Sequence, residues 1–362
     1  MKKSEITERK IYTYLMDHPG SSAPQIAEKL GITRITVFLY LQKLIEGEKV
    51  MQTGARSSTR YFVDTRVLSD MSVSPESVVE YIIHQTKMEY GEDILPSHVN
   101  EIFNTYFLFL DSRDRFFIGI EGFVLWCQDA RHDFSSRIRE KAYEYFTLVG
   151  SIEYRRKKHE FFDATELARK NLEDEMDIGF DVFLFHDVFA LPDGYGRTRI
   201  ALELAYGKQN GDKTLLGHAI ASSGEAIRNY STKHAIDAII YTPPTQGRNI
   251  QFRDVLEKSL QMPLEKIRAE KIHLPNTILQ AQKNIRDRRL RIQNARNSIM
   301  VDIPSNLQTL SHILILDDSF TTGATPNAIA LKLREAGYKG KITIITICGS
   351  FSYDLAIMED EI

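Results

Sequence analysis

Three helices are predicted near the start of the chain, because apolar residues recur there at intervals of three or four positions. The first helix falls within residues 5–17, and Pro19 and Gly20 end it. Gly31 ends the second helix, and Thr33 is placed to cap the start of the third. The apolar positions that define the three helices are Ile6, Ile11, Tyr14, Leu15, Ile26, Ala27, Leu30, Val37, Leu41 and Leu44.

Two short strands follow these helices. Residues 48–52 (EKVMQ) and 60–63 (RYFV) have strand-like composition, and a Gly- and Ser-rich tip separates them. Three helices and a hairpin are the elements of a small winged helix-turn-helix domain, which we expect over residues 1–65. The stretch IAEKLGITRITV, residues 26–37, resembles that family, and the resemblance implies binding to double-stranded DNA.

The local charge of this first module favours a DNA contact. Residues 1–63 hold ten Lys and Arg against six Asp and Glu, whereas the net charge of the whole chain is only -3. A basic surface must therefore be local. The candidate DNA-binding residues, placed to touch phosphates or a groove, are Arg34, Lys43, Arg56 and Arg60.

The outward face of the third helix departs from the usual pattern of a DNA-recognition helix, which is polar. Here the outward positions include Ile35, Phe38, Leu39 and Tyr40. Some of these side chains can contact thymine methyl groups in the major groove. The alternative is that this face packs on another domain or subunit and that the winged helix is purely structural.

The middle of the chain, residues 72–180, is predicted to be an α-helical region that serves as a spacer or a dimerisation unit. A linker over residues 64–75 precedes it, and aromatic-rich segments with helical periodicity follow. Trp126 and Cys127 lie in an apolar stretch and are predicted core residues. The histidines of this region lack the spacing of metal ligands.

A strand–loop–helix–strand pattern occupies the end of the chain. Residues 312–316 (HILIL) and 341–349 (KITIITICG) have the composition of buried strands. Between them, Thr325 and Pro326 suit the cap and the first residue of a helix. The pattern predicts an α/β domain with an open parallel sheet over residues 181–362, whose ligand binds beyond the carboxyl ends of the strands.

The chemistry of the loop after the first of these strands indicates a sugar phosphate as ligand. The candidate phosphate-binding residues are Thr321, Thr322, Gly323, Ala324 and Thr325. Their N–H groups and hydroxyls can donate to an anion, and the dipole of the following helix favours negative charge. Asp317 and Asp318, just before this loop, suit the two hydroxyls of a ribose, either directly or through Mg²⁺.

The segment DDSFTTGAT, Asp317 to Thr325, resembles the phosphoribosyl pyrophosphate (PRPP) motif of type I phosphoribosyltransferases. The resemblance implies a phosphoribosyltransferase-type fold in which the acidic pair holds the ribose hydroxyls and the loop holds the 5′-phosphate. It also implies PRPP and Mg²⁺ as ligands, with Asp317 and Asp318 as catalytic residues. Thr321 stands where hypoxanthine-type members carry an aspartate base, so that salvage activity is not expected.

Upstream segments are similar to ComF-like members of this class. Residues 235–260 resemble their pyrophosphate-side loop with its strand and helix, and Lys208 stands where a lysine is usual. Arg248 can clamp pyrophosphate through paired guanidinium donors, although a plain turn role for PPTQGR fits equally well. A further similar segment, residues 276–301, contains Gln280, Arg288, Arg291 and Asn294. The CxxC zinc element with which ComF-like proteins normally begin is missing.

The basic stretch KNIRDRRLRIQNAR, residues 283–296, carries six basic residues and one acid. Three roles remain open for it: a flexible lid that closes on pyrophosphate, a solvated helix face, or a contact to single-stranded nucleic acid.

Three functions fit this combination of modules. The protein is a phosphoribosyltransferase that transfers ribose phosphate to an amine or a nucleobase, or it is a transcription regulator that senses PRPP without turnover. The PRPP-sensing regulator has the same domain plan as purine-operon repressors, which join a winged helix to a phosphoribosyltransferase-like domain. A ComF-like role in handling single-stranded DNA is the third.

Composition limits the class of protein and the cellular location that we expect. Hydrophobic residues make up 43% of the chain and charged residues 26%, as in ordinary globular proteins, and no apolar stretch has the length of a membrane helix. Two distant cysteines exclude a CxxC zinc site and a disulfide framework. We therefore expect a cytoplasmic protein without membrane contact, and a homodimer.

Overall fold

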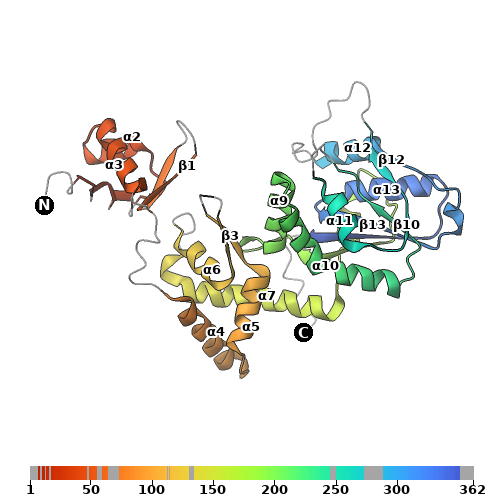
Figure 1. Ribbon diagram of the computed structural model, residues 1–362, viewed down its shortest axis with the longest axis horizontal. Helices are drawn as coiled ribbons and strands as arrows, with labels where there is room; N and C mark the ends of the chain where they lie inside the picture. The colour runs from red at the N-terminus through yellow and green to blue at the C-terminus, as the bar shows by residue number, and fades with distance from the viewer. Residues whose placement is uncertain are drawn as a thin grey trace. The chain divides into compact units, whose positions relative to one another are not determined.

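The computed structural model describes residues 7–8, 10–12, 14–15, 18–46, 49–54, 59–63, 73–111, 113, 115–129, 134–244, 250–272 and 288–350. The chain divides into two compact units, Met1–Ser151 and Ile152–Ile362 (Figure 1). Within the described residues, every helix is too short or too polar to span a bilayer. The division into three domains that the sequence indicates stays a prediction.

The first unit begins with the predicted winged helix-turn-helix. After helical turns that bury Ile11 and Leu15, its elements are α2 (Ala23–Leu30), α3 (Arg34–Glu46), β1 (Val50–Thr53) and β2 (Arg60–Val63). The strands pair antiparallel, with Val50 opposite Val63. A separate hydrophobic core fills this module, and it includes the predicted stripe of α3.

Local chemistry defines the ends of the two principal helices. A capping box between Ser22 and Gln25 begins α2, and Gly31 ends it with a left-handed φ of 65°. Thr33 caps α3 as predicted, because its Oγ1 accepts a hydrogen bond from the Thr36 N–H at 3.2 Å.

The middle of the chain is mainly helical, as expected. Its elements are α4 (Pro75–Tyr90), α5 (Pro96–Tyr106), β3 (Leu108–Leu110), β4 (Phe116–Ile118), α6 (Gly119–Gln128), a 3-10 turn (Ser135–Arg137) and α7 (Ile138–His159). The β3–β4 hairpin was not predicted from the sequence. Trp126 and Cys127 are buried, which confirms them as core residues. Residues 64–72 of the predicted linker lie outside the described residues.

A six-stranded sheet forms the centre of the second unit. In spatial order its strands are β10 (Glu265–Lys266), β9 (Ala238–Tyr241), β13 (His312–Phe320), β14 (Lys341–Gly349), β6 (Val182–Val188) and β5 (Phe162–Asp163). Every neighbouring pair is parallel except β5 with β6. The predicted parallel sheet is thus present, although a phosphoribosyltransferase fold in the stricter sense remains a prediction.

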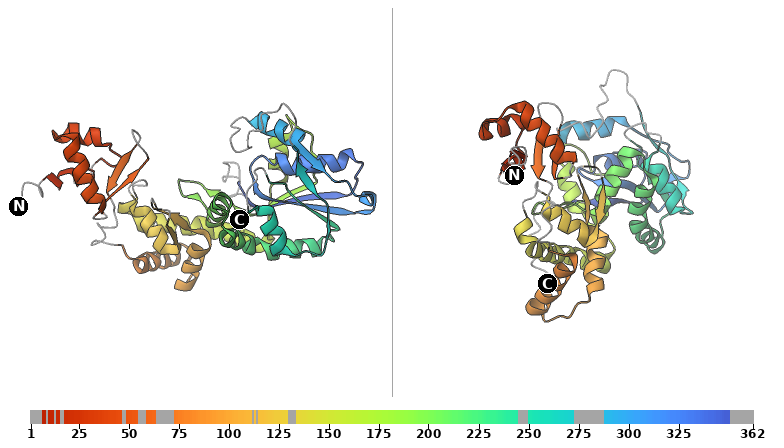
Figure 2. Two further views of the ribbon diagram at one scale, coloured as in Figure 1. Left: turned by 45° about the horizontal axis from the view of Figure 1, so that its top comes forward. Right: turned by 60° about the vertical axis from the view of Figure 1, so that its left-hand side comes forward.

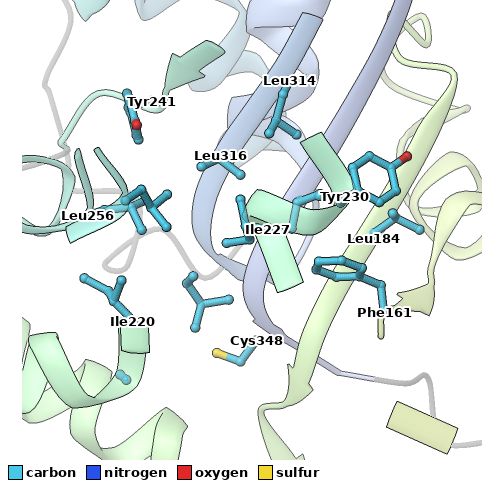
Figure 3. Packing of buried hydrophobic residues seen from close by; sticks show 14 of the residues in the cluster. Phe161, Leu184, Ile220, Ile227, Tyr230, Tyr241, Leu256, Leu314, Leu316 and Cys348 are labelled. Atoms are coloured by element: carbon cyan, nitrogen blue, oxygen red, sulfur yellow. The ribbon is translucent and has the colours of Figure 1, made fainter. Parts of the chain in front are cut away.

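Helices cover both faces of this sheet (Figures 1 and 2). On one face, α9 (Arg199–Asn210), α10 (Lys213–Lys233) and α11 (Phe252–Leu260) bury their apolar sides against alternate strand residues, among them Leu314 and Leu316 (Figure 3). The intervening strand residues are also buried and face α13 (Ala324–Glu335). The remaining elements are α8 (Thr165–Leu172), β7 (Ala190–Leu191), β8 (Gly196–Arg197), β11 (Ala269–Lys271), α12 (Arg288–Ser298), β12 (Ile299–Val301) and a 3-10 turn (Leu307–Thr309).

Two details of the strand–loop–helix unit correct the sequence-based expectation. The strand does not end at residue 316 but continues to Phe320, because its pairing with β14 persists to Phe320 opposite Gly349. The helix begins at Ala324, after Gly323 with a φ of 76°. The prediction of Thr325 as the cap was therefore wrong, since Thr325 already lies in the first helical turn.

Candidate functional sites

The acidic pair lies at the reversal point of the parallel sheet. In the sheet, β9 and β13 are neighbours. The strand that follows β9 in the chain, β10, lies on the side of β9 away from β13, and the strand that follows β13, β14, lies on the side of β13 away from β9. In open α/β sheets, ligands bind beyond the carboxyl ends of the strands at such a point. Asp317 and Asp318 lie in the last part of β13, and Thr242 directly follows β9.

Asp317 is held by the neighbouring strand end. The Thr242 hydroxyl donates to its Oδ1 at 2.6 Å, and the Asp318 N–H donates to the same oxygen at 2.8 Å. Burial, followed by the negative charge of Asp318, raises the pKa of Asp317 to about 7. Burial and the neighbouring charge thus both disfavour the charged form of this carboxyl group.

Asp318 points to the other face of the sheet and meets Lys208 of α9. Lys208 Nζ lies 2.6 Å from Asp318 Oδ2, with 28% and 25% of the two side chains exposed. Burial alone would raise the pKa of Asp318, but the charge and hydrogen bond of Lys208 and the Ser319 hydroxyl at 2.7 Å outweigh it and lower that pKa. Lys208 is correspondingly held as the cation: burial opposes its charge, yet Asp318 and Asp317 raise its pKa.

Strand alternation explains why the pair divides between the two faces. Asp318 shares the face of Leu314 and Leu316, which α9–α11 cover, whereas Asp317 shares the face of Ile315. A ligand that lies across the carboxyl edge of β13 can therefore meet one carboxyl group from each face.

Two residues beside this pair were missed by the sequence reasoning. Burial lowers the pKa of Lys271 in β11, and the negative charge of Asp317 acts in the opposite direction. Cys348 is buried in β14, and its Sγ lies 3.8 Å from the carbonyl oxygen of Asp318. No local pattern marks either residue: Cys348 reaches the pair because β14 pairs with β13, and Lys271 lies on β11, which pairs with β12 in a separate two-stranded sheet.

The predicted phosphate loop is a tight turn between β13 and α13. Thr321 is exposed, and the Thr322 Oγ1 accepts a hydrogen bond from the Ala324 N–H at 3.3 Å. Gly323 is buried with positive φ, and a Cβ there would lie 3.0 Å from the Phe183 ring. Ala324 and Thr325 lie in the first turn of α13, so the positive end of a twelve-residue helix follows the tight turn.

The other residues that the sequence predicts as ligand contacts stay predictions. Arg248 and Gln280 lie outside those residues. Arg288, Arg291 and Asn294 belong to α12, which packs beside α13.

The side chains at the carboxyl edge of the sheet suit Mg²⁺ only if a phosphate ligand supplies most of the ion's coordinating oxygens. Among the described residues, no group of three or more His, Cys, Asp or Glu side chains could hold a metal by itself. Carboxylate oxygens are nevertheless the ligands that Mg²⁺ prefers, and one or two of them suffice when phosphate oxygens complete the shell. Because their carboxyl groups point to opposite faces of the sheet, Asp317 and Asp318 fit only an indirect contact with an ion that arrives with a phosphate ligand.

Three of the four candidate DNA-binding residues lie on the surface of the winged helix. Arg34 and Lys43 are exposed on α3, and Arg60 is exposed on β2. The ammonium of Lys43 lies 5.3 Å from the centre of the Tyr40 ring, and Arg60 donates to the Thr59 carbonyl at 3.1 Å. Arg56 lies outside the described residues.

A family model described as winged helix-turn-helix DNA-binding matches residues 4–50. The match covers the helices of the module and reaches the start of its first strand, so the chain carries a winged helix-turn-helix domain of the DNA-binding kind at its N-terminus. A comparison with curated proteins finds no match.

Proposed function

We propose that the C-terminal α/β domain binds PRPP at the carboxyl edge of β9 and β13, and that this domain is coupled to the DNA-binding winged helix. One observation carries the proposal. Asp317 and Asp318 stand at the reversal point of a parallel sheet, and a tight turn and the N-terminus of α13 follow them within six residues of chain. Ribose hydroxyls and a phosphate require these two chemistries next to each other.

The acidic pair accepts hydrogen bonds from the ribose hydroxyls in this proposal. Asp317 is oriented for this by Thr242, and Asp318 by Ser319. The 5′-phosphate lies against residues 321–325, where N–H groups, hydroxyls and the helix dipole favour an anion. The Lys208 ammonium, which neutralises Asp318 in this structure, is close enough to this edge to turn to the pyrophosphate.

Mg²⁺ would be held mainly by pyrophosphate oxygens, with Asp317 and Asp318 contacting it only indirectly, and it would supply charge to the departing pyrophosphate. In a transfer reaction, the bond between ribose C1 and the pyrophosphate oxygen breaks, and pyrophosphate leaves with that electron pair. A nitrogen of the acceptor forms the new bond to C1 and loses a proton. The chain positions the ribose for this exchange through the acidic pair and the phosphate loop.

Sensing without turnover is the second candidate, and the DNA-binding module in the same chain favours it. PRPP in such a regulator shifts the winged helix between two states by binding one of them more tightly. The same acidic pair serves both candidates, so that only an activity measurement separates them.

Pyrophosphate release from PRPP and Mg²⁺ is the experiment that tests the proposal, with nucleobases and simple amines as acceptors. The Asp317→Asn/Asp318→Asn variant removes both negative charges at nearly constant volume. Asp302→Asn, at an exposed aspartate outside the site, is the matched control. Release that only the double variant loses identifies a transferase. PRPP binding without release identifies a sensor, and the absence of PRPP binding contradicts both.

A further inference from the structure

We propose that the outward face of α3 recognises the methyl groups of thymine in the major groove of duplex DNA. This inference deepens the DNA-binding half of the proposed function and rests on it. It is independent of whether the C-terminal domain binds PRPP.

The geometry of α3 separates an inward and an outward apolar face. Val37 and Leu41 are buried in the core of the winged helix. On the outward side, Ile35 is 74% exposed, Phe38 52% and Leu39 58%. These positions are spaced i, i+3 and i+4, which brings their side chains together on one patch of the helix surface.

These three side chains are not part of the hydrophobic core of the module. The module has its own filled cluster of buried residues, to which the inward positions of α3 contribute. A single exposed apolar residue is ordinary, but a contiguous exposed patch on a monomer marks an interaction site. The patch lies on the helix that, in a winged helix-turn-helix of the DNA-binding kind, enters the major groove.

The surroundings of this patch favour DNA over a protein as the occupant. The exposed cations Arg34 and Lys43 flank it on α3, and the exposed Arg60 lies on the wing. Cations around a reading helix are the arrangement that holds phosphates on both sides of a groove. The polar side chain that follows on the same stripe is Gln42, also exposed, and glutamine pairs with the N6 and N7 edge of adenine.

Thymine is the base that matches an apolar patch, because its C5-methyl group is the apolar feature of the major groove. Ile35 and Leu39 offer aliphatic surface to such methyls, one helical turn apart. Specificity would therefore come from A·T pairs at neighbouring steps, recognised by apolar contact, while the cations supply affinity that is independent of sequence.

The test begins with selection of duplexes from a random DNA library by the full-length protein, with and without PRPP and Mg²⁺. Thymines in the selected site are then replaced one at a time by deoxyuridine, which removes only the methyl group. We expect the affinity to fall about fourfold for each contacted methyl, the fold-change that corresponds to about 0.8 kcal/mol.

Substitutions at exposed positions should leave the fold intact, and they show which side chain causes the loss of affinity with deoxyuridine. Ile35→Ala and Leu39→Ala should each lose the deoxyuridine effect at the thymine that the substituted residue contacts. Leu95→Ala, at a comparably exposed leucine on the helical region, should keep every wild-type difference. Circular dichroism checks the folding of all three. Salt-sensitive binding without any deoxyuridine effect overturns the inference and leaves DNA binding intact. Selection of no duplex in either buffer, with an altered oligomeric state of the Leu39→Ala variant in sedimentation, overturns it in favour of a protein interface.

Discussion

At the scale of single residues, Gly323 is the position where the proposed phosphate loop is most sensitive. Its φ of 76° and the 3.0 Å distance that a Cβ would have from the Phe183 ring both disfavour a side chain. We expect Gly323→Ala to lower the free energy of unfolding by about 1–3 kcal/mol. PRPP affinity should fall as well, because the turn aims the loop N–H groups.

Gly217→Ala is the matched control for that substitution. Gly217 lies inside α10, and no atom of the part of the chain that the structure describes stands within 4 Å of a Cβ there. Helix propensity then predicts a gain of up to about 1 kcal/mol. Denaturant unfolding of the two variants measures both effects, and an equal response of the two would contradict the account of the turn.

Asp187, a buried residue at the end of β6, should make stability depend on pH. Its Oδ1 accepts the Val188 N–H at 2.7 Å, while its buried Oδ2 has no hydrogen-bond partner among the described residues. Burial raises the pKa of Asp187 to about 7 from its ordinary value of 3.8. Between these pH values the folded state binds more protons than the unfolded state, so the free energy of unfolding falls as the pH rises.

Asp187→Asn should remove this pH dependence. The stability of the wild type relative to the variant should fall by about 2–4 kcal/mol between pH 4 and pH 8. Hydrogen exchange of the β6 amides at several pH values measures it locally. A difference between the two proteins that stays constant with pH would contradict the burial of a neutral carboxyl group.

At the scale of elements, the sequence was informative where chemistry and spacing coincide. The strand before Asp317, the turn at Gly323, the helix after it and the second strand all follow from local pattern. The position of the strand end does not, because β13 extends to Phe320 through pairing with β14, a segment about thirty residues away in the chain.

The link between α9 and β13 could not be derived from spacing. Lys208 and Asp318 are 110 positions apart, and the resemblance to ComF-like proteins placed Lys208 only on the pyrophosphate side. The ion pair forms because strand alternation turns Asp318 toward the face that α9 covers. Cys348 likewise reaches the site through the pairing of β14 with β13.

A double-mutant cycle measures how strongly this link stabilises the domain. Lys208→Met or Asp318→Asn alone leaves a half-buried group without its partner, so each should destabilise the protein. The double variant should be more stable than the sum of the two losses predicts, with a coupling free energy of about 1–2 kcal/mol. Additive losses in thermal or denaturant unfolding would mean that the pair contributes no interaction.

At the scale of the whole molecule, a DNA-binding module and the proposed PRPP site lie in one chain. If the two are coupled, PRPP changes the Kd for the selected duplex by some factor. The duplex must then change the Kd for PRPP by the same factor. We expect this factor to be about 5- to 150-fold. Fluorescence anisotropy and calorimetry give the two factors independently, and two factors of one would show that the modules act separately.

The homodimer expected from the sequence is a further whole-molecule prediction. Sedimentation equilibrium over a range of concentrations tests it, and a single species with the mass of one chain would contradict it.

Calorimetric titration of the full-length protein with PRPP and Mg²⁺ tests the central claim most directly. The account predicts saturable binding to the wild type and to the Asp302→Asn control, and its loss in the folded Asp317→Asn/Asp318→Asn variant. No binding to the wild type, or equal binding to all three proteins, would contradict the assignment of this sheet edge as a PRPP site.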